Sequence, residues 1–140
     1  MTRKILALLG AGLLVLGLSA CMTTDEAGVF TRLNALRAQA GQAALLPDGE
    51  LVAKAQAQSQ VMAGQGTLFH STLRDGVTGA PRRMGENVAV AGSIDRAFQA
   101  LVDSPPHYAN MVDGSFNRVG VGIFQGPDGR VWVTMVFAQR

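Results

Sequence analysis

The residues of this chain best suited to chemistry are two histidines and one glutamate. His70, Glu86 and His107 each stand among polar or turn-forming neighbours, and the sequence contains no other histidine. An imidazole titrates near neutral pH and binds metal ions, and a carboxylate can orient it or transfer protons. Because the chain uses histidine so sparingly and outside apolar stretches, we predict that these three residues form a site.

Three arrangements of these residues are open. His70 and His107 could bind a divalent ion such as zinc, with Glu86 as general base of a metal-assisted hydrolase, although the spacing matches no His-Glu-x-x-His motif. Ser104 and His107 could form a nucleophile and base, with Glu86 orienting the imidazole. However, no Gly-x-Ser-x-Gly motif is present, and a serine before Pro105 is typical of a turn or helix N-cap. In the third arrangement, hydrogen bonds of Glu86 and His107 tie a loop to the helix after Ser104.

Three helices and a long loop are expected to position the site. Helical spacing of apolar residues and capping residues predict the helices from Thr24 or Asp25 to Gly41, from Asp48 to about Met62, and from Ser93 to Ser104. A short helical turn is expected after Pro106 and extends through Met111. The segment from Gly64 to Arg83 lacks periodicity and is rich in glycine, so it is predicted to be a loop that contains His70.

The end of the chain has a different period. Apolar residues alternate over residues 119–123 and again over residues 131–137, and the sequence Gly126-Pro127-Asp128-Gly129 lies between them. This pattern predicts two antiparallel strands joined by a turn. Helices followed by strands indicate an α+β fold.

The first 20 residues have the features of an export signal. Arg3 and Lys4 precede an apolar run over residues 5–18, which is shorter than a membrane-spanning helix. The sequence Leu18-Ser19-Ala20-Cys21 then resembles the lipobox of bacterial lipoproteins, in which the cysteine is acylated after cleavage. We therefore expect a lipoprotein signal peptide over residues 1–20, an acylated Cys21 with a short tether over residues 21–24, and one domain over residues 25–140.

Removal of the signal changes the net charge. Of the twelve Lys and Arg residues two lie in the signal, which leaves ten against ten Asp and Glu. A mature chain with a net charge of about zero gives no support for a nucleic-acid partner. The tether is so short that the domain must stay close to its membrane, so we expect its working surface to face the bilayer or the adjoining wall. Met22 stands where an aspartate retains some lipoproteins at the inner membrane, which favours an outer membrane where one exists.

Four motifs in order resemble one protein family. They are Gly85-Glu86-Asn87-Val88-Ala89, the segment from Ser104 to Met111, Arg118-Val119-Gly120-Val121-Gly122 and Trp132-Val133-Thr134. Between about Val29 and Ala138 the chain resembles the CAP superfamily of cysteine-rich secretory, antigen 5 and pathogenesis-related proteins, and above all its small bacterial SCP-like members. The resemblance implies a three-layer α-β-α sandwich with a small, largely antiparallel sheet.

The resemblance also implies an open cleft lined by two histidines and two acidic residues. His70, Glu86 and His107 take three of these positions, and the fourth aligns with Ser104. Tyr108 stands where an arginine is common, and Asn87 beside Glu86 is counted with the cleft. With one carboxylate fewer, we expect a binding or interaction module for a lipid or cell-wall ligand rather than an enzyme, with no required cofactor; zinc at His70 and His107 is the alternative.

Overall fold

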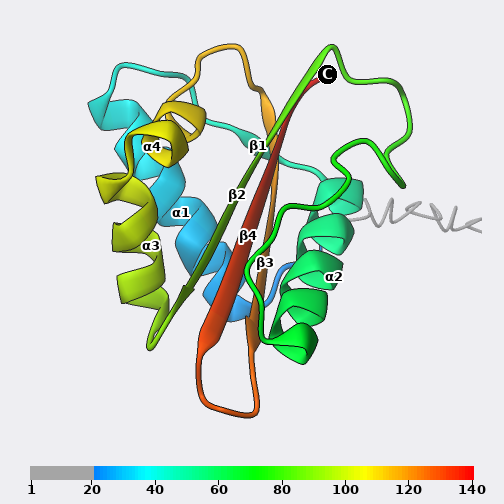
Figure 1. Ribbon diagram of the computed structural model, residues 1–140. Coiled ribbons are helices and arrows are strands. Elements are labelled where there is room, and N and C mark those ends of the chain that lie inside the picture. Colours follow the sequence, from blue (N-terminus) through cyan, green and yellow to red (C-terminus); the bar gives the residue numbers. More distant parts are fainter. Residues whose placement is uncertain (1–20) are drawn as a thin grey trace, which may run out of the picture.

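The computed structural model describes residues 21–140 (Figure 1). Residues 1–20, which include the predicted signal peptide, lie outside the described residues. The elements follow in the order α1 (Thr24–Gln39), β1 (Leu46–Pro47), α2 (Gly49–Gln65), β2 (Arg83–Ala91), α3 (Ile94–Asp103), α4 (Pro105–Met111), β3 (Arg118–Gln125) and β4 (Val131–Gln139). In the part of the chain from Cys21 onward, no helix has the length and apolar character needed to cross a bilayer.

One four-stranded sheet organises the molecule. The strand order is β1-β3-β4-β2, so β2 lies at one edge, and β3 forms most of the other because β1 is only two residues long. β4 pairs antiparallel with both β2 and β3, and β1 pairs parallel with β3. The predicted α+β fold with a largely antiparallel sheet is confirmed.

Helices cover both faces of the sheet. Alternate residues of the central strand β4 point to opposite faces. Val133, Met135 and Phe137 share a core with side chains of α1, α3 and α4, whereas Val136 and Ala138 pack with α2. Figure 1 shows α2 on one side of the strands and the other three helices on the opposite side. The result is the expected α-β-α sandwich.

Two glycines of β3 let α2 approach the sheet closely. A Cβ atom at Gly120 would lie 2.0 Å from the backbone of Leu51, and one at Gly122 would lie 2.1 Å from the backbone of Ala55. No side chain fits in that space. The small residues between the valines of this strand are therefore required by the packing of α2.

The helix ends agree with the capping residues, with two shifts. Asp48 and Ser93 cap α2 and α3 as predicted. The N-cap of α1 is Thr23 rather than Thr24, because Thr23 forms a capping box with Glu26. α2 continues past Gly64 to Gly66, which adopts the left-handed conformation with φ 64° that favours glycine at a helix end.

The strand β2 is not predicted by the sequence pattern. The sequence places Glu86 and Asn87 in a polar setting that resembles a turn, but both are buried within the strand. A strand that buries polar side chains to build a site loses the apolar alternation by which strands are predicted. Glu86 therefore lies on the sheet and not in a loop, while the preceding segment, which contains His70, has neither helix nor strand.

Candidate functional site

Glu86 and Asn87 are neighbours in β2 and point to opposite faces of the sheet. Glu86 pairs with Val136, whose side chain packs with α2, and Asn87 pairs with Met135 in the core beneath the other helices. Each of the two polar residues binds a segment on its own face, and each of those segments contains one histidine.

On the α2 face, Glu86 binds the loop that contains His70. One carboxylate oxygen accepts hydrogen bonds from His70 Nδ1 at 2.8 Å and from the Ser71 backbone N–H at 2.9 Å. The other oxygen accepts one from Ser71 Oγ at 2.5 Å. Because only 3% of the Glu86 side chain is exposed, these hydrogen bonds replace its hydration. Both oxygens of Glu86 are thus engaged in holding the loop.

The contact with Glu86 fixes the tautomer of His70. A carboxylate oxygen only accepts hydrogen bonds, so Nδ1 must carry the proton and donate it. In the neutral ring, Nε2 is then the atom with the free lone pair. The His70 side chain is 59% exposed, which leaves this nitrogen able to bind a ligand.

Four further hydrogen bonds, made by three residues of α2, hold the loop against this helix. Gln58 Nε2 donates to the Phe69 carbonyl at 2.7 Å, and Lys54 Nζ donates to the Thr72 and Asp75 carbonyls at 3.0 and 2.9 Å. The backbone N–H of Thr78 donates to Glu50 at 2.8 Å.

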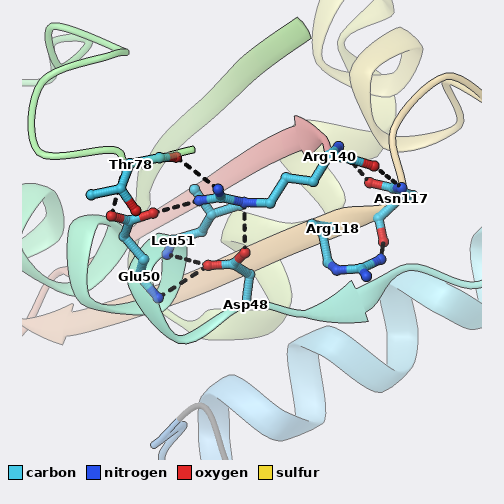
Figure 2. A network of polar contacts seen from close by, with 7 residues as sticks. All are labelled: Asp48, Glu50, Leu51, Thr78, Asn117, Arg118 and Arg140. Carbon is cyan, nitrogen blue, oxygen red and sulfur yellow. Dashed lines mark hydrogen bonds and ion pairs between the residues drawn. The ribbon is translucent and has the colours of Figure 1, made fainter. Parts of the chain in front are cut away.

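The C-terminal residue Arg140 completes these contacts. It donates to the Thr78 carbonyl and pairs with Asp48 and Glu50 (Figure 2). The backbone N–H of Arg140 also donates to the side-chain oxygen of Asn117 at 2.9 Å. His70 therefore lies on a segment that is bound along its whole length.

On the opposite face, Asn87 positions α4. Its side chain is fully buried, and its Nδ2 donates to the His107 carbonyl at 2.9 Å. Its Oδ1 accepts a hydrogen bond from Asn110 Nδ2, also at 2.9 Å. Asn87 thus fixes the backbone of His107 and the side chain one helical turn further on.

The segments that contain the two histidines contact β2 from opposite faces of the sheet, the His70 loop through Glu86 and the His107 backbone through Asn87. The pKa of His107 lies below its usual value, mainly because burial disfavours the charged ring and also because of the nearby His70. His107 is therefore neutral at pH 7 and can accept or donate a hydrogen bond, depending on its tautomer.

A groove of about 210 Å³ runs from His107 along this edge. Its walls are mostly apolar, with Ser104 and His107 at one end, and the lining residues are Leu68, Val88, Ala89, Val90, Ala100, Leu101, Ser104 and His107. Three of them are consecutive in β2 although their side chains alternate between faces, so the groove follows the strand edge itself. The groove thus combines one imidazole, that of His107, with mostly apolar walls, and His70 is not among its lining residues.

Comparison with known proteins identifies the family. A model of the cysteine-rich secretory protein family, CAP, matches residues 30–137, a span that includes both histidines and the whole sheet except the last two residues of β4. The chain belongs to the CAP family. The resemblance that the four motifs indicate is confirmed, and the site described above lies within the matched CAP domain.

Solved structures share the fold of this CAP domain. An outer surface protein from Borrelia burgdorferi aligns with a TM-score of 0.73 and 18% identity over 83% of this chain and 92% of its own. An extracellular SCP-domain protein from Bacillus anthracis has the same TM-score and 22% identity over 83% of this chain, but only 40% of its own length is covered. No curated protein sequence matches. At these identities the structures support the fold alone.

Zinc binding by His70 and His107 is the alternative that the sequence leaves open for the CAP cleft. A structure named NaASP2 with Zn²⁺ aligns with a TM-score of 0.61 and 14% identity over 83% of this chain and 80% of its own. Within residues 21–140, however, no three His, Cys, Asp or Glu side chains are grouped so that they could hold a metal ion. Catalytic zinc sites normally use three protein ligands. Two imidazoles, with Glu86 bound to one of them, do not form such a set.

The predicted hydrogen bonds between loop and helix need a correction. Glu86 binds the loop, as expected, but it is Asn87 that binds α4, and it does so through the backbone carbonyl of His107 rather than through the ring. The reason is the alternation of side chains along β2, because Glu86 faces away from α4.

Ser104 and Tyr108 contribute less than the sequence indicates. Ser104 is the N-cap residue of α4, but its side chain forms no capping hydrogen bond. It lines the groove beside His107, while Tyr108 is half-buried and lies outside the groove lining. Glu86 binds His70 and Ser71 through both of its oxygens, so it neither orients His107 for a Ser104 nucleophile nor stays free to act as a general base.

Sequence reasoning missed two residues of the site, Ser71 and Asn110. Ser71 supplies two of the three hydrogen bonds to Glu86, and Asn110 bonds to Asn87. Asn110 could have been found, because a residue three positions after His107 lies on the same side of a helix. Ser71 could not, since its role depends on the path of the loop.

Proposed function

We propose that this chain is a lipid-anchored protein of the bacterial cell envelope whose CAP domain binds a ligand at the free edge of β2. Relatives named as outer surface and extracellular proteins support this location. The export signal and the lipobox ending at Cys21 support the anchor, and an outer membrane is the favoured location where the organism has one.

One observation carries the binding role: Glu86 is occupied and the imidazole that it orients is not. A general base needs a carboxylate or imidazole free to take a proton from the substrate or from water. Glu86 has both oxygens bound to His70 and Ser71, whereas more than half of the His70 side chain is exposed. Glu86 therefore cannot act as the general base that a metal-assisted hydrolase would need, and the exposed ring of His70 is available to a ligand.

The chemistry of the groove indicates the kind of ligand. Its apolar walls suit a hydrocarbon or other apolar group, and His107 in its lining suits a hydrogen-bonding group beside it. A lipid fragment or a cell-wall fragment with an apolar substituent has both. The proposed ligand is therefore an amphipathic envelope molecule.

Binding is tested with the domain starting at residue 21 and carrying Cys21→Ser. A panel of envelope lipids and wall fragments is screened by calorimetry, and His70→Ala and His107→Ala are compared with the exposed control Gln99→Ala. Loss of a detected affinity by about tenfold or more in both histidine variants, with no change in the control, supports the proposal. Failure of every ligand to bind, or equal binding by all variants, contradicts it.

The anchor is tested separately. Metabolic labelling with a fatty acid is expected to label the full chain, and Cys21→Ser is expected to abolish both the label and membrane association. Persistent membrane association of Cys21→Ser would show that the lipobox interpretation is wrong.

A further inference from the structure

The proposed anchor point lies at the opposite edge of the sheet from the histidines. Gln56 of α2 donates a hydrogen bond from Nε2 to the Cys21 carbonyl at 3.2 Å and another to Glu26 at 2.8 Å. Glu26 also accepts from the backbone N–H of Thr23 at 2.8 Å and of Ile123 at 2.9 Å. Residues 21–23 are thus bound against α2 and the outer edge of β3.

These contacts restrict the movement of residues 21–23, which belong to the predicted tether. Only 1% of Glu26 is exposed, and it joins the start of α1, α2 and β3 in one buried cluster. The residue that would carry the acyl chains is itself hydrogen-bonded to the fold. Acylation at Cys21 would therefore fix the orientation of the domain as well as its distance from the membrane.

The surface next to Cys21 carries few charges. The sequence of α2 contains no charged residue after Lys54, and the segment from Val119 to Pro127 contains none. Gln60 lies one helical turn after Gln56 and is exposed. Phe124 is 37% exposed and follows Gly122 on the α2 face of β3. Asp25 is the charged residue closest to Cys21 along the chain. Arg130 is the charged residue near Phe124, because its guanidinium lies 5.0 Å from the ring of Trp132, which pairs with Phe124.

We propose that this surface, formed by Cys21, Gln56, Gln60 and Phe124, lies against the lipid headgroups of the bilayer. The inference rests on the proposed anchoring. An uncharged surface with an exposed aromatic ring loses little hydration there, and aromatic rings favour the interface between membrane and water. The acyl chains at Cys21 bring it there.

The strand order then places the histidine site away from the bilayer. β4 separates β3 from β2, so the two edges are about 10 Å apart at the strand axes, and the side chains and helices add to this distance. His70 and His107 open toward the aqueous side. The ligand reaches the groove from the wall or the surrounding fluid, and of the two surfaces expected from the short tether, the wall is the one that the site faces.

Cysteine labelling tests this orientation in the acylated chain. Cys21 is the only cysteine and its thiol is consumed by acylation, so a cysteine introduced elsewhere is the single labelling site. The variants Gln60→Cys and Phe124→Cys probe the proposed surface, and Gln99→Cys on the exposed side of α3 is the control. Each acylated variant is labelled with a small fluorophore and reconstituted into phosphatidylcholine vesicles that contain a headgroup-linked quencher.

The labels at positions 60 and 124 are expected to be quenched at least about threefold more than the label at position 99, because aromatic and uncharged groups settle at the interface. Addition of Gln56→Ala is expected to reduce this ratio, because it releases Cys21 from α2. Flotation with the vesicles but equal quenching at all three positions, or strongest quenching at position 99, would overturn the orientation alone. A chain that does not float with the vesicles would overturn the anchoring and the orientation together.

Discussion

At both edges of the sheet a buried glutamate binds a neighbouring segment of chain, but the hydrogen-bond donors differ. Each has a buried glutamate that accepts three hydrogen bonds and binds a segment of chain to the sheet. At the β3 edge, the donors to Glu26 are two backbone N–H groups and the amide of Gln56. At the β2 edge, one donor to Glu86 is the imidazole of His70, whose second nitrogen, Nε2, is not bound to the carboxylate.

This difference shows what the proposed binding site has that a purely structural contact does not. The amide groups that donate to Glu26 have no nitrogen with a free lone pair. The contact at the β3 edge therefore stabilises the fold and offers no such atom to a ligand. The donor from His70 is a ring that remains exposed on its other side. The kind of donor, rather than the carboxylate, decides which edge can bind a ligand.

The largest loss of stability is expected at the β3 edge. Glu26→Ala removes the buried acceptor of three hydrogen bonds. Hydrogen bonds to a charged group contribute about 1.5–3 kcal/mol each, so we expect a loss of about 3 kcal/mol or more in the free energy of unfolding. Urea unfolding measures it, with the exposed neighbour Asp25→Ala as control. Equal losses in the two variants would mean that Glu26 does not hold this edge.

A smaller and more local loss of stability is expected at the β2 edge. Glu86→Ala should lower the free energy of unfolding by about 2 kcal/mol, because the released loop can hydrate its own donors. Hydrogen exchange is expected to show loss of protection at the Ser71 amide, while the Ile123 amide stays protected. Unchanged protection at Ser71 would contradict the role assigned to Glu86.

Asn87 distinguishes the two histidines. Asn87→Ala removes the hydrogen bonds to the His107 carbonyl and to Asn110, and should cost about 1–2 kcal/mol. Chemical-shift changes are expected to be large for His107 and small for His70, whereas Glu86→Ala should give the reverse. The same response of both rings to both variants would show that the two sides of β2 are not separate supports.

The smallest effect is a pH dependence from His107. Its pKa in the folded state is below its ordinary value of 6.5, so the folded state binds fewer protons than the unfolded state as pH falls through this region. The corresponding stability is present above about pH 6.5 and is lost on acidification below it. The urea midpoint should therefore fall further between about pH 7.5 and about pH 5.5 for the wild type than for His107→Gln. An equal fall of the urea midpoint in the wild type and in His107→Gln would show that burial of His107 does not contribute to the pH dependence.

Much of the fold could be predicted because local rules agree with it. Asp48 and Ser93 cap helices where the sequence indicates, and the alternation in β3 and β4 is that of real strands. β2 could not be predicted, since Glu86 and Asn87 interrupt its apolar pattern in order to build the site. β1 has only two residues, too few to show any periodicity.

The sequence names the candidate residues of the site but does not indicate the hydrogen bonds between them. The scarcity of histidine and the family motifs indicate His70, Glu86 and His107. The partnership of His70 with Glu86 depends on the path of the loop across α2, which is set by Lys54, Gln58 and the distant Arg140. Contacts of this kind leave no local pattern in the sequence.

The tautomer of His70 tests the central claim most directly. If Glu86 holds His70 and leaves Nε2 for a ligand, long-range ¹H–¹⁵N spectra of the neutral ring will show the proton on Nδ1 in the wild type. Glu86→Ala, which removes the acceptor, is expected to shift the population toward the Nε2-protonated form. A wild-type ring with its proton on Nε2 would contradict the account, because His70 could not then donate from Nδ1 to the carboxylate.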